Sequence, residues 1–389
     1  MKVVILFFLF FPISLKAQTN TSVQFKSQIL NENRTIQIHL PKSYNDSVNL
    51  KYPVVYTLDG DYLFSETYSI IDYYSYWSKS PECIVVSIHQ NYTDTVKKEF
   101  IRWLDCSYSW NTGFPKSKGI LFKDFINKEL IPHIDKTYRT THFRGIVGHS
   151  FTANFINYFL FDSISNFDAY ISISPYYAKK SLDSLKLVLN TINQPIFYFV
   201  AVGQNDLSGH IKSVKEFDKK FSKIKNTNFK YKFYKENTDA THSSIVPKSL
   251  PYAIDHIFSI FTSINTKSKY KAVKKSKNSL NYLLNKYKSI ENIYGVNIKI
   301  RLEDIEIVSD LIINKNEWND LKTLADISFK LYPNEYIGYW IMAEYEAHNK
   351  NYRSSLLYYN EGIEMLKKSG CSNIEDFMKD VDRVKKKVK

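Results

Sequence analysis

One stretch of the chain decides its fold: Arg144-Gly145-Ile146-Val147-Gly148-His149-Ser150-Phe151-Thr152. An apolar, strand-like run stops at a glycine, reaches a serine, and passes at once into the helix-like run 153–161. This order is typical of a nucleophile elbow, whose sharp turn forces the serine into strained backbone angles and lifts its hydroxyl above the sheet edge. The pattern predicts Ser150 as a nucleophile.

The stretch departs from the usual G-x-S-x-G spacing at its last position. Gly148 is present, but Thr152 stands where the second glycine is expected. Glycines flank such a serine because a Cβ there would meet the strand or the following helix. Two interpretations remain open: an elbow that has adjusted to the larger residue, or an elbow whose activity is blunted.

Two segments further along the chain supply the partners that a serine nucleophile needs. The apolar run 195–203 ends in Gln204-Asn205-Asp206, as expected for a buried parallel strand that presents an aspartate at its carboxyl end. A second strand-like run, 229–234, leads to His242. A serine hydroxyl is a weak nucleophile until an imidazole accepts its proton, and a carboxylate fixes the tautomer of that imidazole. Serine, aspartate and histidine occur in the chain order of α/β-hydrolases.

The acid of this predicted triad has rivals. Glu236 and Asp239 also precede the histidine, and a Ser–His dyad needs no acid. His210 and His256 compete for the role of base, and His256 lies in the helical run 254–261, where a structural role is expected. We expect His149, which adjoins the nucleophile, to pack and orient, because its ring would point away from the hydroxyl.

These segments together resemble the putative esterase family, in particular its esterase D-like and siderophore esterase-like α/β-hydrolases. The resemblance covers roughly residues 22–260. It is carried by six segments: Tyr52-Pro53-Val54-Val55-Tyr56-Thr57-Leu58-Asp59-Gly60-Asp61, residues 125–134, Tyr138-Arg139-Thr140, Gly148-His149-Ser150, Ile171-Ser172-Ile173-Ser174-Pro175 and Thr241-His242-Ser243. It implies a mostly parallel sheet with helices on both faces, and hydrolysis of a carboxylic ester or thioester through a serine acyl-enzyme without metal or cofactor.

Two backbone amides are expected to bind the oxyanion. Phe151, the residue after the nucleophile, supplies one of them. The second is expected in the loop after the strand 52–58, where the resemblance favours Asp61 or its neighbour.

The segment 91–119 is long, aromatic and without clear periodicity, as lids and binding loops often are. We predict that Arg102, Trp103 and Trp110 within it contact the substrate. Simple packing of the loop explains its aromatic residues equally well.

The cysteines and histidines show no spacing typical of a metal site. The chain has neither C-x-x-C nor H-E-x-x-H, so we expect no metal. Cys83 and Cys106 lie at the start of the strand 84–88 and in the loop after it. A disulfide between them and two buried free thiols both remain open.

Residues 1–17 have the pattern of a secretory signal peptide. Lys2 precedes the apolar run 3–13, and Leu15-Lys16-Ala17 forms a plausible cleavage site. The apolar run is shorter than the roughly 20 residues that span a bilayer. We expect an exported protein, periplasmic or secreted.

The net charge of +14 is spread along the chain. Basic residues are dense only at 267–277 and 385–389, and such runs are usually solvated. We therefore expect no nucleic-acid partner.

The composition changes after Phe261. Residues 262–277 are polar and predict a linker, and residues 278–389 predict helices throughout, so residues 22–261 form the predicted α/β-hydrolase domain. Residues 316–368 resemble tetratricopeptide-like hairpins, although a generic helical appendage fits nearly as well. This domain would cap the hydrolase or dock a protein partner, and truncation after Phe261 is expected to leave a soluble domain.

The sequence thus predicts a serine esterase that acts on a small-molecule ester such as a siderophore or another acylated compound. Two alternatives use the same scaffold. One is a catalytically weak hydrolase-fold protein that presents ligands or partners through its helical domain. The other is an acyltransferase that excludes water.

Overall fold

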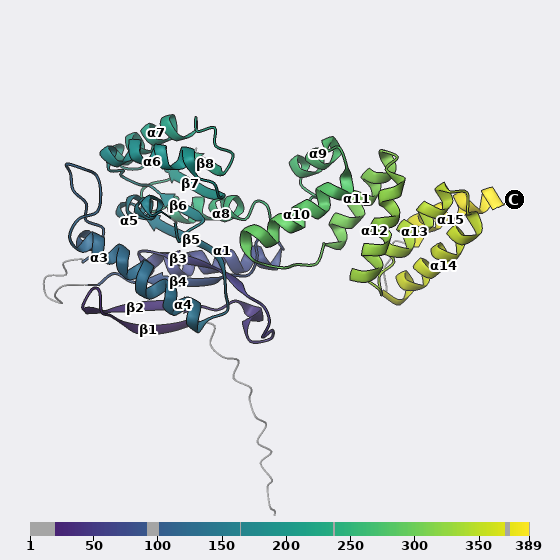
Figure 1. The fold of residues 1–389 in the computed structure, drawn as a ribbon, viewed down its shortest axis with the longest axis horizontal. Helices are drawn as coiled ribbons and strands as arrows, with labels where there is room; N and C mark the ends of the chain where they lie inside the picture. The colour runs from purple at the N-terminus through teal and green to yellow at the C-terminus, as the bar shows by residue number, and fades with distance from the viewer. Residues whose placement is uncertain (1–19, 92–100, 164, 236–237, 370–373, 389) are drawn as a thin grey trace, which may run out of the picture.

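The computed structural model describes residues 20–91, 101–163, 165–235, 238–369 and 374–388. The predicted signal peptide and Glu236 lie outside these ranges, as does part of the segment 91–119. Within them the chain forms an α/β body followed by a row of helices, the helical region (Figure 1).

An eight-stranded sheet is the centre of the α/β body. Its order is β1-β2-β4-β3-β5-β6-β7-β8. The pairs β1–β2 and β2–β4 are antiparallel, and every pair from β4 to β8 is parallel. The strands are β1 (Asn20–Ser27), β2 (Glu32–His39), β3 (Tyr52–Thr57), β4 (Ile84–Ile88), β5 (Thr140–His149), β6 (Ala169–Ile173), β7 (Ile196–Val202) and β8 (Phe229–Lys235). The mostly parallel sheet agrees with what the family resemblance implies.

Helices cover both faces of this sheet because its central strands are apolar on both sides. Every residue of β3, β4, β6 and β7 is buried. The helices α1 (Gly60–Tyr76) and α8 (Ile245–Ile257) pack on one face. The other face is covered by α3 (Lys118–Phe125), η2 (Ile126–Leu130), α4 (Ile131–Thr137), η3 (Ile156–Phe161), α6 (Lys179–Thr191) and α7 (Ser208–Phe221).

The helical region runs from α9 to α15, and from α10 onward each helix packs against the next. Its helices are α9 (Lys267–Lys275), α10 (Ser279–Tyr294), α11 (Leu302–Asn314), α12 (Trp318–Leu331), α13 (Ile337–His348), α14 (Tyr352–Ser369) and α15 (Ile374–Val388). The segment 262–277, for which the sequence predicts a linker, instead contains α9. Its lysines and alanine favour a helix, and Val273 is buried. The tetratricopeptide-like assignment stays a prediction.

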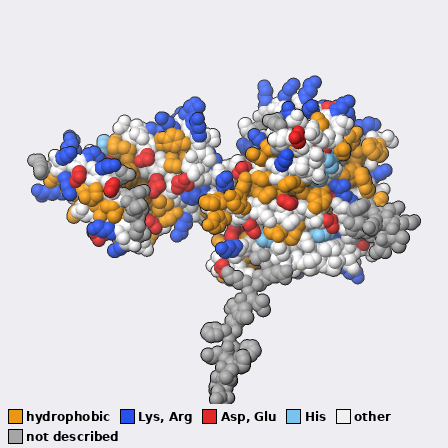
Figure 2. All heavy atoms as spheres, turned by 180° about the vertical axis from the view of Figure 1, so that it is seen from behind, with side chains coloured by type: hydrophobic (Ala, Val, Ile, Leu, Met, Phe, Trp, Pro, Cys, Tyr) orange, Lys and Arg blue, Asp and Glu red, His pale blue; other side chains and the backbone are white. Residues whose placement is uncertain are grey.

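The cysteines, the surface charge and the helix lengths bear on three other predictions. Cys83 and Cys106 are buried free thiols and form no disulfide. Figure 2 shows lysine and arginine side chains over both the α/β body and the helical region. No helix in the described ranges is both long and apolar enough to cross a membrane.

The helical region is joined to the α/β body through a shared core. Tyr294, the last residue of α10, is buried against Phe143 of β5, with ring centroids 5.0 Å apart. Its hydroxyl donates a hydrogen bond to the Ile257 carbonyl at 2.9 Å. Gly295 follows in the left-handed conformation (φ 66°), where a Cβ would lie 2.7 Å from the Thr141 side chain. This junction lies where β5 begins, so the helical region sits at the amino ends of the parallel strands.

This junction revises the expected result of truncation after Phe261, because that cut removes Tyr294 and uncovers Phe143. We predict that Tyr294→Ala lowers the free energy of unfolding by about 3 kcal/mol or more, since it removes a large buried ring and its hydrogen bond. Chemical denaturation measures the change. The matched control is Tyr270→Ala, at an exposed position on α9. Equal unfolding midpoints for the two variants would show that the junction contributes no stability.

Candidate active site

The predicted strand–turn–helix is present at Ser150. This residue lies between β5 and α5 (Phe151–Phe155), with φ 61° and ψ −113°. A positive φ is strained for a serine and persists only where its surroundings enforce it. The Ser150 amide donates to the Ile173 carbonyl of β6 at 2.8 Å. Gly148 is required, because a Cβ there would lie 2.7 Å from the backbone of Thr152.

Thr152 fits the turn without opening it. Its side chain is buried, and Oγ1 accepts a hydrogen bond from the His149 amide at 2.9 Å. The same oxygen lies 2.7 Å from Oδ2 of Asp59 and donates to it. The position of the usual second glycine therefore holds a hydroxyl with partners of its own, which favours the adjusted elbow over the blunted one.

Asp206 and His242 are brought together at the carboxyl ends of β7 and β8. Nδ1 of His242 lies 2.7 Å from Oδ1 of Asp206. Asp206 also accepts hydrogen bonds from Ser174 Oγ at 2.5 Å and from the Leu207 amide at 2.6 Å. Burial raises the pKa of Asp206, but these hydrogen bonds outweigh it and hold the pKa below its usual value. The ionised carboxylate holds the Nδ1–H of His242, which leaves Nε2 as the proton acceptor.

Two of the rival groups, Asp239 and His210, lie in the described residues, and neither occupies the position of its predicted counterpart. Asp239 is exposed, and its carboxylate accepts from Asn205 at 3.5 Å. Nδ1 of His210 is bonded to the Ser174 carbonyl at 2.7 Å. The His210 ring lies 4.7 Å from that of His242, so His210 flanks the proposed base. Sequence reasoning missed Ser174, although a serine directly after the apolar run 169–173 was a usable signal. In the structure Ser174 has φ 48°.

His149, the residue before Ser150, contacts His242. Nε2 of His149 lies 2.9 Å from the His242 carbonyl, and the two imidazole rings are 4.7 Å apart. Within the described residues, the Ser150 hydroxyl makes no hydrogen bond to His242. Catalytic hydrogen bonds are often long in unliganded enzymes and tighten when substrate binds.

His149 is held as a neutral ring. Because the His242 carbonyl can only accept, Nε2 of His149 carries the hydrogen, and Nδ1 accepts from the Tyr62 hydroxyl at 2.9 Å. Burial, followed by the nearby charge of His242, lowers the pKa of His149 to about 4. The ring therefore packs and orients, as the sequence predicts.

The oxyanion candidates lie at two helix starts. Phe151 is the first residue of α5, and Asp61 lies in the first turn of α1. The Asp61 carboxylate accepts from the Gln90 amide at 3.0 Å and lies 3.1 Å from Nδ1 of His89. The carboxylate thus forms hydrogen bonds beside β4, and the group predicted to bind the oxyanion is the backbone amide of Asp61.

A cavity of about 480 Å³ opens beside Ser150. It is lined by Trp103, Leu104, Ser107, Tyr108, Trp110, Lys116, Ser150, Phe151, Tyr176 and His210. The ring of Trp103 lies 4.7 Å from that of Phe151, and Trp110 lies 5.1 Å from Tyr108. Trp103 and Trp110 are 59% and 74% exposed, so both rings are open to a ligand. Two of the three residues predicted to contact substrate line this cavity.

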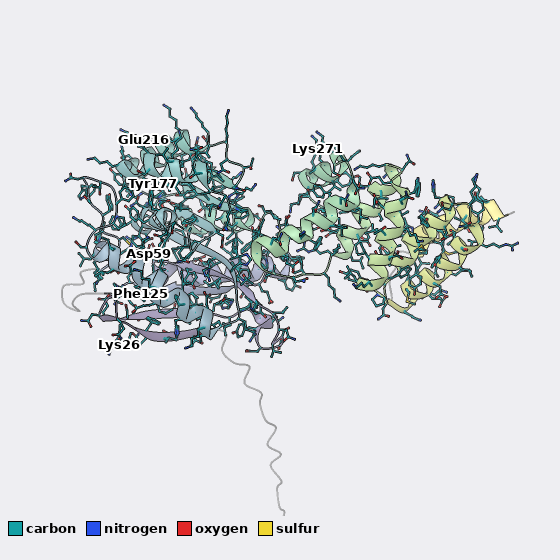
Figure 3. The ribbon with its side chains drawn as sticks, in the orientation of Figure 1. Lys26, Asp59, Phe125, Tyr177, Glu216 and Lys271 are labelled. Carbon is teal, nitrogen blue, oxygen red and sulfur yellow. The ribbon has the colours of Figure 1, made fainter. Side chains whose placement is uncertain are left out.

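Arg102, the third, is placed differently. Its Nε lies 2.6 Å from Oδ1 of Asp59, and one terminal nitrogen lies 2.9 Å from Oδ2. The same nitrogen donates to the His149 carbonyl at 2.9 Å. These contacts hold the guanidinium against Asp59 and the His149 carbonyl, and Arg102 does not line the cavity. The structure therefore offers no support for direct contact between Arg102 and substrate. Figure 3 shows Asp59 on the side of the α/β body away from the helical region.

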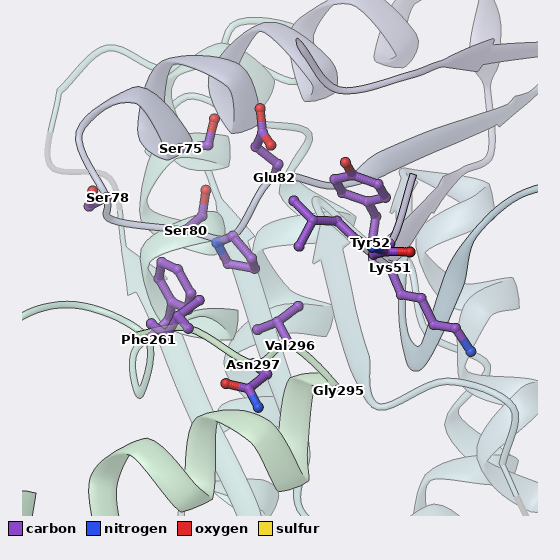
Figure 4. A pocket seen from close by; sticks show the side chains of 14 residues that line it. Lys51, Tyr52, Ser75, Ser78, Ser80, Glu82, Phe261, Gly295, Val296 and Asn297 are labelled. Carbon is purple, nitrogen blue, oxygen red and sulfur yellow. The ribbon is translucent and has the colours of Figure 1, made fainter. Parts of the chain in front are cut away.

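A second cavity lies at the opposite edge of the sheet. It has a volume of about 460 Å³ and lies between the start of β3 and the loop after α10 (Figure 4). Tyr52, Glu82, Phe261 and Val296 are among its lining residues. None of the predicted triad residues lines it.

Comparison with known proteins places this geometry in context. The sequence model of the family described as "Putative esterase" matches residues 27–227. No curated protein shows significant sequence similarity to the chain.

Three solved structures illustrate the similarity of fold. An uncharacterised protein from Capnocytophaga ochracea is 20% identical, with a TM-score of 0.74, over 88% of this chain and 93% of that one. An IroE-like serine hydrolase from Shewanella oneidensis is 22% identical, with a TM-score of 0.57, over 76% and 95%. A siderophore hydrolase, EstA, from Aspergillus nidulans is 17% identical, with a TM-score of 0.52, over 66% and 100%.

The environment of His149 can be tested by its titration. We predict that its imidazole stays neutral down to about pH 4 and carries its hydrogen on Nε2. The unfolded chain binds this proton at a higher pH than the folded chain does, so His149 makes folding less stable as the pH falls from about 6.5 toward 4. Nitrogen-resolved NMR of the imidazoles measures both properties. A titration centred near pH 6.5 would contradict the buried, hydrogen-bonded placement.

Proposed function

The chain belongs to the putative esterase family, and from this membership we propose that it is a serine esterase with Ser150, His242 and Asp206 as its triad. As a member of this family, the chain is a carboxylic-ester hydrolase. The covalent mechanism and the class of substrate are the parts that we propose.

In the proposed mechanism, Ser150 Oγ attacks the carbonyl carbon of the ester while Nε2 of His242 takes its proton. The tetrahedral intermediate then collapses as His242 returns this proton to the leaving alcohol, which leaves an acyl group on Ser150. Water attacks that acyl group while His242 takes its proton, and the bond to Ser150 breaks as His242 gives this proton to Ser150 Oγ and the acid product departs. The carboxylate of Asp206 stabilises the imidazolium in both halves. The amides of Phe151 and Asp61 are the proposed donors to the oxyanion.

One observation carries this proposal. The hydrogen bond of 2.7 Å between Asp206 and His242 is formed beside a serine whose positive φ places it at the start of a helix. A packing role for these residues would require neither the strained serine nor an ionised carboxylate on Nδ1 of the imidazole. The hydrogen bonds of Thr152 favour an adjusted elbow over a blunted, non-catalytic one.

The cavity beside Ser150 supports an ester with an aromatic or similarly flat group. Trp103, Tyr108 and Trp110 provide ring faces for such a group, and Lys116 also lines the cavity. The similar structure from Aspergillus nidulans is described as a siderophore hydrolase, which supports a siderophore-like ester among the candidates. A thioester fits the same chemistry.

Two further proposals concern the setting of the enzyme. The composition of residues 1–17 supports export to the periplasm or beyond. The helical region sits at the amino ends of the strands, away from Ser150. A protein partner bound to the helical region would therefore not block the cavity.

The nucleophile and base can be tested by kinetics. We predict that the full chain hydrolyses p-nitrophenyl butyrate and that Ser150→Ala and His242→Ala each lower kcat by about four orders of magnitude or more. Exposed Ser243→Ala serves as a matched surface control. Parental values of kcat in both Ser150→Ala and His242→Ala would contradict the proposal.

The acid has its own test. Asp206→Asn is expected to lower kcat by up to about 10⁴-fold, because an amide no longer fixes the tautomer or stabilises the imidazolium. Asp239→Asn, at an exposed position in the same loop region, should stay within a few-fold of the parent. Near-parental activity of Asp206→Asn would favour a dyad or a different acid.

A further inference from the structure

We propose that Thr152, Asp59 and Arg102 form a positioning bridge that ties the nucleophile turn to the oxyanion loop and to the aromatic wall of the substrate cavity. None of the three is assigned to touch the reacting atoms. The inference deepens the proposed function and rests on it, since it concerns how the same site is held.

Asp59 is the centre of this bridge. It lies between β3 and α1 in the left-handed conformation (φ 58°), and its side chain is fully buried. A buried carboxylate requires charged and hydrogen-bonding partners. Arg102 supplies the charge through two hydrogen bonds of 2.6 and 2.9 Å, and Thr152 adds a third of 2.7 Å. The Tyr62 hydroxyl lies 3.1 Å from the same carboxylate.

The bridge holds both backbone groups of the residue before the nucleophile. The amide of His149 donates to Thr152 Oγ1 at 2.9 Å, and the carbonyl of His149 accepts from Arg102 at 2.9 Å. That carbonyl belongs to the peptide that enters Ser150. Its orientation therefore constrains the backbone of the strained turn at Ser150. A glycine at position 152, as in G-x-S-x-G, has no side chain with which to do this.

The other end of the bridge is α2 (Arg102–Asp105), which carries part of the cavity wall. This short helix turns Arg102 and Asp105 inward and leaves Trp103 and Leu104 exposed. Asp105 is paired with the buried Arg34 through hydrogen bonds of 2.6 and 2.8 Å. Two internal ion pairs thus fix α2.

The fixed helix in turn holds the Trp103 ring 4.7 Å from Phe151. The cavity wall, the nucleophile turn and the oxyanion loop are therefore linked through one carboxylate, that of Asp59. The aromatic wall is preorganised for substrate.

The hydroxyl of Thr152 can be removed with little change of shape. Thr152→Val leaves Asp59 and the His149 amide each short of one buried partner, whereas Thr152→Ser keeps both hydrogen bonds. We expect Val to lower kcat by about tenfold or more while KM changes less than about threefold, and Ser to stay within about threefold of the parent. Thr152→Gly, which restores the usual spacing, should lower kcat as well.

The experiment measures kcat and KM for p-nitrophenyl butyrate with the full chain, together with hydrogen–deuterium exchange of the 149–151 amides. The exchange rate of these amides can be measured without substrate. We expect it to become about tenfold faster in Thr152→Val but not in Thr152→Ser. Arg102→Lys, which keeps the charge but loses the bidentate fork, gives the same readouts where Thr152→Val does not fold.

Three results would overturn the bridge: parental kcat and exchange in Thr152→Val, equal losses in Val and Ser, or a higher kcat in Thr152→Gly. The proposed function fails separately. In that case the parent hydrolyses no ester or Ser150→Ala matches it, while the exchange difference between Val and Ser still decides whether the bridge exists.

Discussion

The turn at Ser150 is the constraint on which the rest of the site depends. A serine with a positive φ costs on the order of 1–3 kcal/mol, so the surrounding structure must enforce it. The Ile173 carbonyl holds its amide, and Gly148 gives the following helix room to approach the strand. Asp59 further restrains the turn, because its carboxylate accepts a hydrogen bond from the Thr152 hydroxyl. Because β5 lies between β3 and β6, the loops that follow these three strands meet around one residue.

The candidate active site and the helical region lie at opposite edges of the sheet. Its carboxyl edge carries Ser150, Asp206 and the aromatic cavity, while its amino edge receives the helical region through Tyr294. Two hydrophobic clusters lie on opposite faces, and the one that contains α1 and α8 continues into the helices that follow. The helical region therefore extends one core of the α/β body, and it leaves the entrance to the candidate site uncovered.

Much of this arrangement could be predicted from the sequence because it depends on local pattern. Continuous apolar runs mark the parallel strands, and the order of Ser150, Asp206 and His242 along the chain indicates where three loops converge. The ion pair between Asp59 and Arg102 could not be predicted, since it joins residues 43 positions apart and depends on burial of both charges. Because this partner of Arg102 is not apparent from the local sequence, the sequence predicts that Arg102 contacts the substrate. A usable signal was the pattern of α2, in which two charged residues flank two apolar ones.

Covalent labelling of the active serine distinguishes a Ser150 nucleophile from every alternative. The full chain is treated with a fluorophosphonate, which reacts with activated serines, and the modified peptide is located by mass spectrometry. Activation of Ser150 by His242 and Asp206 predicts one adduct, on the peptide that contains Ser150, and none in Ser150→Ala. An unmodified parent, or an adduct that persists in Ser150→Ala, would contradict the assignment of Ser150 as the nucleophile.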